Sequence, residues 1–134
     1  MASITREIEV AVPAAAAWAR VRDVAHTHHL FAGVLTDCKM EEGARVVTFA
    51  NGMVVRELIV DIDEARHRVA YAAVGGRATH HNASLQVIPD GDGARIVWTL
   101  DFLPAELAPF VGGLVEAGSA AMKASLEAGV GVGV

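Results

Sequence analysis

The feature that most constrains this fold is an unbroken run of β-type patterns from residue 33 to residue 103. The predicted strands are Val34–Met40, Arg45–Ala50, Met53–Ile62, Arg68–Val74, His80–Ile88 and Arg95–Leu103. The connections between them are short, and Asn51-Gly52 is the strongest hairpin signal among them. Parallel strands need crossovers of roughly a dozen residues or more, which these connections cannot provide. The run therefore predicts an antiparallel sheet.

A further strand and two short helices are expected before this run, and one long helix after it. Residues 4–12 alternate apolar and polar side chains, which is typical of a strand with one solvated face. Pro13 favours the start of a helix, and a second helical turn is expected over residues 25–31. From Leu107 the apolar period becomes that of a helix, which predicts a helix to about Ala128. The predicted fold class is α+β, with a curved seven-stranded antiparallel sheet around the long C-terminal helix.

The length and composition indicate one domain with an internal space. A chain of 134 residues suits a single domain, which we assign to residues 1–128, and the Gly/Val segment 129–134 is expected to be flexible. Hydrophobic residues make up 53% of the chain but aromatic ones only 5%, so small side chains dominate. One helix, about 10–12 Å across, cannot fill the concave face of such a sheet. We therefore expect a mostly apolar cavity between the sheet and the helix.

Charge and cysteine content exclude several classes of function. A formal net charge of −5 argues against nucleic-acid binding, which needs a basic face. The single cysteine, Cys38, cannot form a disulfide within the chain and is expected to be a buried thiol, as suits a reducing compartment. No signal peptide and no apolar stretch of about 18 residues is found. These features predict a cytoplasmic protein that does not enter a membrane.

The order of elements and several motifs resemble a known superfamily. The motifs are Val12-Pro13 with Trp18, Cys38, Arg56-Glu57-Leu58, Arg68-Val69-Ala70-Tyr71, His81-Asn82, Pro89-Asp90-Gly91-Asp92-Gly93 with Trp98, and the final amphipathic helix. Over residues 3–128 they resemble the helix-grip fold of the START-like (SRPBCC) superfamily, which includes the Bet v 1-like birch-pollen allergens. The polyketide cyclase/dehydrase group is the most similar. The resemblance implies a cavity for a small hydrophobic or aromatic molecule.

One departure from a related group bears on the ligand. Abscisic-acid receptors carry a lysine in the second strand where this sequence has Thr36. An acid held by that lysine is therefore not expected. The aromatic residue that the resemblance implies after the second short helix is Phe31, which lies in a run rich in histidine.

Three side chains are candidates for acid–base chemistry. By alternation, Tyr71 and His81 point inward, and histidine titrates near neutral pH. In the strand 53–62 both faces are apolar, so either Arg56 or Glu57 could enter the cavity; the resemblance favours Glu57. A buried carboxyl group suits general acid or base work. The alternative for His81 is a histidine at the rim of the cavity with no catalytic role. The alternative for Glu57 is an exposed side chain paired with an arginine of a neighbouring strand.

The remaining candidates are contacts to the ligand rather than catalysts. They are His29, Phe31, Thr36, Arg56, Ala83, Leu85, Trp98, Leu100, Phe102, Phe110, Leu114 and Met122. Histidines at positions 26, 28 and 29 invite a metal site, since two histidines on one helical face can bind zinc. No cysteine pair, His-Glu-x-x-His motif or suitably spaced carboxylate accompanies them, so no metal is predicted.

Two functions follow as expectations. The first is a cofactor-free cyclase or dehydratase-type lyase that acts on an aromatic or polyketide-like ketone with His81, Tyr71 and Glu57. The alternative is a non-catalytic carrier or sensor of a lipophilic metabolite, quinone-like molecules included. The sequence leaves open whether an exposed sheet edge or helix forms a homodimer.

Overall fold

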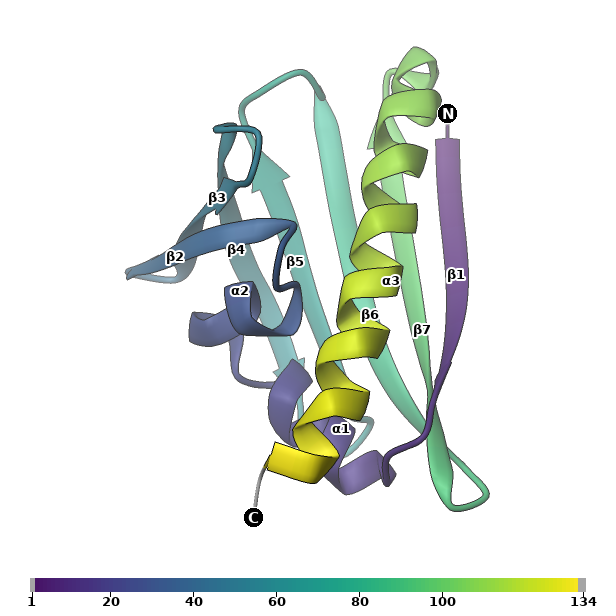
Figure 1. Ribbon diagram of the computed structural model, residues 1–134. Coiled ribbons are helices and arrows are strands. Elements are labelled where there is room, and N and C mark those ends of the chain that lie inside the picture. Colours follow the sequence, from purple (N-terminus) through teal and green to yellow (C-terminus); the bar gives the residue numbers. More distant parts are fainter. Residues whose placement is uncertain (1, 133–134) are drawn as a thin grey trace.

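A curved seven-stranded antiparallel sheet wraps one long helix in the computed structural model, which describes residues 2–132 (Figure 1). The strand order is β1-β7-β6-β5-β4-β3-β2, so β1 and β2 are the two edges. The strands are β1 (Ala2–Val10), β2 (Leu35–Glu41), β3 (Ala44–Phe49), β4 (Val54–Asp63), β5 (Arg68–Val74), β6 (His80–Asp90) and β7 (Gly93–Leu103). The predicted fold class is confirmed, and the predicted strand boundaries lie within about two residues of these.

Short helices close one end of the sheet. The helix α1 (Ala14–Val21) follows Pro13, and the 3₁₀ turn η1 (Val24–His26) leads into α2 (Thr27–Leu30). The helix α1 packs against β6 and β7, and α2 packs against β2 and the C-terminal helix. In Figure 1 they lie at the end of the molecule where the chain finishes. Helices therefore cover the concave face at this end.

The C-terminal helix α3 (Ala108–Val132) spans the concave face after the 3₁₀ turn η2 (Ala105–Leu107). Its buried side chains recur at helical spacing, as the periodicity predicts. They include Val111, Val115, Met122 and Leu126, and they follow the buried Leu107 of η2. The helix continues to Val132, four residues beyond its predicted end, so the segment expected to be flexible is helical to that point; residues 133–134 lie outside the described part. No helix within the described residues is both long and apolar enough to span a membrane.

A β-bulge in β4 accounts for part of the apolar pattern on both faces of this strand. Ile59 pairs with Tyr71, but the next paired residue of β4 is Asp61, which pairs with Ala70. The extra residue, Val60, is 62% exposed and reverses the alternation. Val55, Glu57 and Ile59 therefore face the core before the bulge, and Ile62 faces it afterwards.

Gly118 allows α3 to approach the sheet closely. A Cβ atom at this position would lie 2.9 Å from Cη2 of the Trp98 ring, whereas one at Gly113 would meet nothing within 4 Å. Alanine is favoured over glycine inside a helix by about 1 kcal/mol. Overpacking a core costs about 1–3 kcal/mol.

We therefore expect Gly113→Ala to raise the free energy of unfolding by about 1 kcal/mol. Gly118→Ala is expected to leave it unchanged or lower it by up to about 2 kcal/mol, because the indole must move. Urea unfolding of the two variants measures the difference. An equal gain at both positions would contradict the close approach of α3 to Trp98.

Candidate functional site

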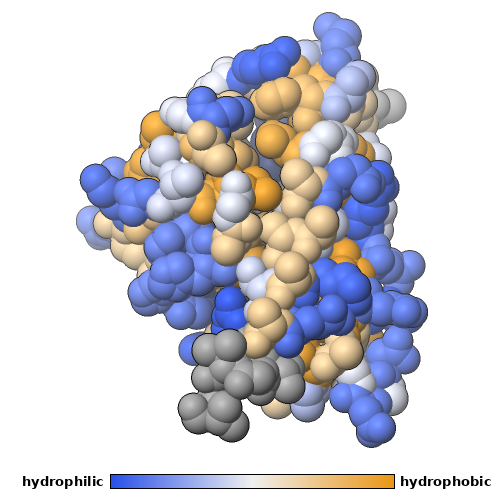
Figure 2. Space-filling view, viewed as in Figure 1, coloured by the Kyte–Doolittle hydropathy of each residue, from blue (hydrophilic) through white to orange (hydrophobic). Residues whose placement is uncertain are grey.

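A cavity of about 300 Å³ lies between the concave face of the sheet and α3. Its exposed lining residues, Val54, Gly75, Gly76 and Arg77, come from the end of the β3–β4 hairpin and from the β5–β6 loop. Phe110, at the start of α3, completes this rim. The mouth therefore opens at the upper end of Figure 1, away from α1 and α2. Figure 2 shows apolar residues along α3 and beside its upper turns.

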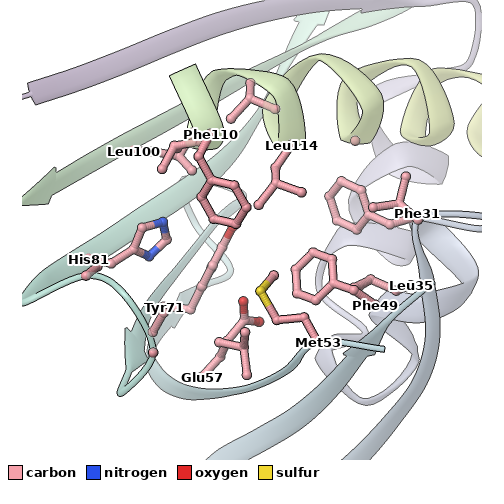
Figure 3. A pocket seen from close by; sticks show the side chains of 18 of the residues that line it. Phe31, Leu35, Phe49, Met53, Glu57, Tyr71, His81, Leu100, Phe110 and Leu114 are labelled. Atoms are coloured by element: carbon pink, nitrogen blue, oxygen red, sulfur yellow. The ribbon is translucent and has the colours of Figure 1, made fainter. Parts of the chain in front are cut away.

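Most of the cavity wall is apolar. Phe31 and Trp98 meet at its inner end with their ring centroids 5.3 Å apart. Figure 3 shows Phe31, Leu35, Phe49 and Met53 on one side of the space, with Phe110 and Leu114 of α3 beside it. The polar atoms that do face the cavity must therefore be paired or serve a ligand, since an unpaired polar group in such surroundings is costly.

The innermost polar group is a buried ion pair. Nε of Arg45 donates a hydrogen bond of 2.8 Å to Oε1 of Glu57, and the two side chains are only 5% and 12% exposed. Nη1 of Arg45 donates to the carbonyl oxygen of Val24 at 3.1 Å. The guanidinium carbon lies 5.0 Å from the ring centroid of Tyr71. Arg45 is thus held from three directions, and it fixes the Glu57 carboxylate in the cavity.

The length of the β3–β4 loop places this pair on the inner face. The backbone N–H of Phe49 donates to the carbonyl of Met53 at 2.8 Å, which closes a three-residue loop over residues 50–52. Gly52 has φ +89°, a left-handed conformation that favours glycine. This loop sets Arg45 directly across from Glu57. A two-residue loop would shift the register by one and move Glu57 to the outer face.

Tyr71 is a buried hydroxyl donor. Its side chain is 6% exposed, and its hydroxyl oxygen accepts a hydrogen bond of 3.1 Å from Nε1 of Trp98. Burial, with a further contribution from the negative charge of Glu57, raises the pKa of Tyr71 far above neutral pH. The hydroxyl therefore stays protonated, and its own proton can be donated to a ligand.

His81 lies on the same inner face, two strands from Glu57. Glu57 pairs with Ala73, and the β5–β6 register, which runs to Ala72↔Asn82, brings His81 next to Ala73. Two strand spacings separate the backbones of Glu57 and His81 by about 10 Å, and only the small Ala73 side chain stands between them. Nδ1 of His81 is buried without a hydrogen-bond partner in the described structure. Burial lowers the pKa of His81, so its imidazole is neutral at pH 7.

The structure brings the three candidate acid–base residues together around one space (Figure 3). It also places five of the expected contact residues in the wall: Phe31, Trp98, Leu100, Phe110 and Leu114. For Glu57 the sequence offered an inward side chain or an exposed one paired with an arginine. The structure has it facing inward and paired with Arg45 of the neighbouring strand.

Three polar residues expected at the ligand lie outside the cavity wall. Arg56 points to the outer face, because it neighbours the inward-facing Glu57 on the same strand. There its Nε contacts Oε2 of Glu41 at 3.1 Å. Thr36 is exposed, and its hydroxyl donates to the carbonyl of Thr48 at 3.3 Å. His29 is exposed on α2.

Four apolar residues expected at the ligand also lie outside the wall. They are Ala83, Leu85, Phe102 and Met122, all buried in the core. Their inward orientation was predicted correctly. Met122 lies beyond Gly118 in the half of α3 that reaches the end closed by α1 and α2. Ala83 and Phe102 instead pair with Leu100 and His81 of the wall, and they are buried within the core beside them. Facing the core is thus not the same as lining the cavity.

Sequence reasoning missed Arg45. The signal was present in β3, where Arg45, Val47 and Phe49 alternate with Val46 and Thr48. Alternation alone places Arg45 on the inner face, and the hairpin places it opposite Glu57.

The three histidine rings of the histidine-rich segment lie against one another. The ring centroids of His28 and His29 are 4.2 Å apart, and Nδ1 of His26 lies 2.9 Å from Asp23. Within the described residues, no group of three or more His, Cys, Asp or Glu side chains is arranged to hold a metal ion. The thiol of Cys38 lies 3.8 Å from the carbonyl oxygen of Val24, and burial raises its pKa, which disfavours the reactive thiolate.

Comparison with known proteins agrees with this architecture. The model of the family described as "Polyketide cyclase / dehydrase and lipid transport" matches residues 1–131. The chain belongs to this family. No curated protein matches the chain.

Several solved structures share the family fold. An uncharacterized protein from Bacillus thuringiensis superposes with a TM-score of 0.84 at 15% identity, covering 93% of this chain and 98% of that one. A Thermobifida fusca protein gives a TM-score of 0.72 at 29% identity, with 92% and 91% covered. Norcoclaurine synthase from Thalictrum flavum, solved in complex with dopamine and hydroxybenzaldehyde, gives 0.75 at 21% identity, with 96% and 86% covered. At these identities the likeness to norcoclaurine synthase and to the Bacillus protein is one of fold.

The burial of the Arg45–Glu57 ion pair can be tested by its contribution to the free energy of unfolding. Removing one partner of a buried pair costs about 3–5 kcal/mol, whereas an exposed pair contributes about 1 kcal/mol or less. We expect Arg45→Met to lower the free energy of unfolding by the larger amount and Arg56→Met, on the outer face, by the smaller. Replacing both Arg45 and Glu57 by apolar residues should restore most of the loss. Urea unfolding measures the free energy of unfolding of each variant. Equal losses in Arg45→Met and Arg56→Met would contradict the burial of the pair.

His81 yields a prediction about pH. Its pKa is lowered in the folded chain, so below the usual histidine value of about 6.5 the unfolded chain binds a proton that the native one does not. The free energy of unfolding should therefore fall as the pH decreases from 6.5 towards the native pKa. His81→Gln should make this decline shallower, as measured by urea unfolding between pH 7 and pH 5. An unchanged slope would show that His81 is not held neutral by burial.

Proposed function

We propose that this chain binds a small hydrophobic or aromatic molecule in the cavity and acts on it by acid–base catalysis without a cofactor. The observation that carries the proposal is the convergence of Tyr71, His81 and Glu57 within a space whose wall is mostly apolar. Pockets for small molecules commonly combine an apolar wall with a few converging polar groups. The family description, which names polyketide cyclases and dehydrases, supports the same class of ligand.

The reaction class that suits these groups is proton transfer next to a carbonyl. In the dehydration of a β-hydroxy ketone, the neutral imidazole of His81 would take the proton from the carbon between the two functional groups. The electron pair would move onto the carbonyl oxygen, which the Tyr71 hydroxyl would stabilise by a hydrogen bond. The hydroxyl group would then leave as water with the proton from His81, and the carbonyl would reform with a new carbon–carbon double bond.

A second candidate function is carriage of the same class of molecule without chemistry. The observation that favours it is the pairing of Arg45 with Glu57, which leaves the carboxylate already engaged by a cation at 2.8 Å. Tyr71 and His81 would then orient the ligand only. The two candidates share the cavity and differ in whether His81 moves a proton.

Binding in the cavity can be tested with a steric block. We expect Ala73→Phe to fill the gap between Glu57 and His81 and to weaken binding of the neutral fluorophore 1-aminoanthracene at least tenfold. Ala72→Phe, on the outer face of the same strand, is the matched control and should bind as the natural sequence does. A fluorescence titration gives both affinities. Equal affinity in both variants would place the bound molecule elsewhere.

Catalysis can be tested with two adjacent histidines. His81→Gln should lower turnover of aromatic β-hydroxy ketones at least 100-fold, within the range for general acid–base groups, and change affinity less than tenfold. His80→Gln is the control, because His80 is exposed and contacts Asn82 on the outer face at 2.6 Å. Ultraviolet absorbance of the enone follows the reaction. Tight binding with no turnover across the panel would favour the carrier.

A further inference from the structure

We infer that the cavity selects uncharged ligands carrying both a hydrogen-bond acceptor and a donor, such as aromatic hydroxy-ketones, and discriminates against carboxylates. The inference rests on the proposed function and specifies its ligand. It arises from Arg45 and Glu57, whose charges offset each other within the cavity wall.

A buried arginine in a ligand cavity first suggests an anion site. The pairing within the protein argues against it here, because Oε1 of Glu57 occupies Nε of Arg45 at 2.8 Å. A ligand carboxylate brought to Arg45 would also approach the carboxylate of Glu57. The attraction of the ligand carboxylate to Arg45 is thus largely offset by its repulsion from Glu57. The ligand carboxylate also loses its hydration on entering the cavity.

The other charges near the cavity do not change this balance. Among the described residues of the wall, only two others can be charged near neutral pH, His81 and Arg77, because the Tyr71 hydroxyl stays protonated. Burial keeps His81 neutral at pH 7. Arg77 is exposed at the mouth, with its guanidinium carbon 4.5 Å from the ring centroid of Phe110, where water and salt screen it. The interior of the cavity is therefore polar in places but has no net charge.

The polar atoms that remain unused define the complementary ligand. Arg45 has five N–H groups, and its recorded bonds to Glu57 and to the carbonyl of Val24 use two of them. The Tyr71 hydroxyl accepts from Trp98 and keeps its proton for a further bond. The free N–H groups of Arg45 and the Tyr71 hydroxyl are thus donors to a ligand. Oε2 of Glu57 and the His81 ring are acceptors. A ligand with a carbonyl and a hydroxyl group can pair with both sets at once.

Matched naphthalene probes test the selection. We expect 6-hydroxy-2-acetonaphthone, which is neutral, to bind at least tenfold more tightly than 2-naphthoate, which has the same rings and a carboxylate, at pH 7.5 by isothermal titration calorimetry. In Glu57→Gln the guanidinium loses its counter-charge, so the affinity for 2-naphthoate should rise at least tenfold relative to the ketone. In Arg45→Gln the carboxylate should be excluded more strongly. Circular dichroism establishes that each variant is folded. Either variant alone tests whether the preference between 2-naphthoate and the ketone changes in the expected direction.

The outcomes separate this inference from the proposed function. If the ketone binds but 2-naphthoate binds equally well or better to the natural sequence, the selection by charge is wrong and the ligand-binding cavity stands. An unchanged preference in a folded Glu57→Gln variant would likewise overturn the role of the ion pair. If neither probe binds, in a protein that also fails to bind 1-aminoanthracene, the proposed function fails together with the inference.

Discussion

The ion pair between Arg45 and Glu57 is the interaction on which the character of the cavity depends. Two charges with side chains 5% and 12% exposed are tolerable in an apolar space only because each has the other within 2.8 Å. The pair also supports its surroundings, since Arg45 reaches the carbonyl of Val24 and lies over the Tyr71 ring. It thereby connects β3, β4 and β5 with the turn that leads into α2, and it presents polar atoms without adding net charge.

The cavity itself is a consequence of geometry and of small side chains. The sheet is curved, α3 meets it at Gly118 against Trp98, and α1 and α2 fill one end of the concave face. Towards the other end α3 and the sheet leave about 300 Å³ between them. Ala73 contributes to that space on the side of the strands, between Glu57 and His81.

Much of the fold could be predicted from the sequence because alternation and hairpin signals are local properties. They gave the right inward residues on β5, β6 and β7, including Tyr71 and His81. They left β4 undecided because the bulge at Val60 reverses the alternation, and because a one-residue difference in the length of the β3–β4 loop decides which face Glu57 occupies. Which inward residues reach the cavity depends on where helices pack, and that is a tertiary property no strand pattern contains.

The central claim is that a small neutral molecule binds inside this cavity with its polar atom at the Tyr71 hydroxyl. A crystal structure of the protein soaked with 2-acetonaphthone tests it most directly. The account predicts the naphthalene rings between Phe31 and Leu114, with the ketone oxygen within hydrogen-bond distance of Oη of Tyr71. Density for the ketone only on the outer surface, or with its oxygen at Arg77 and its rings outside the cavity, would contradict it.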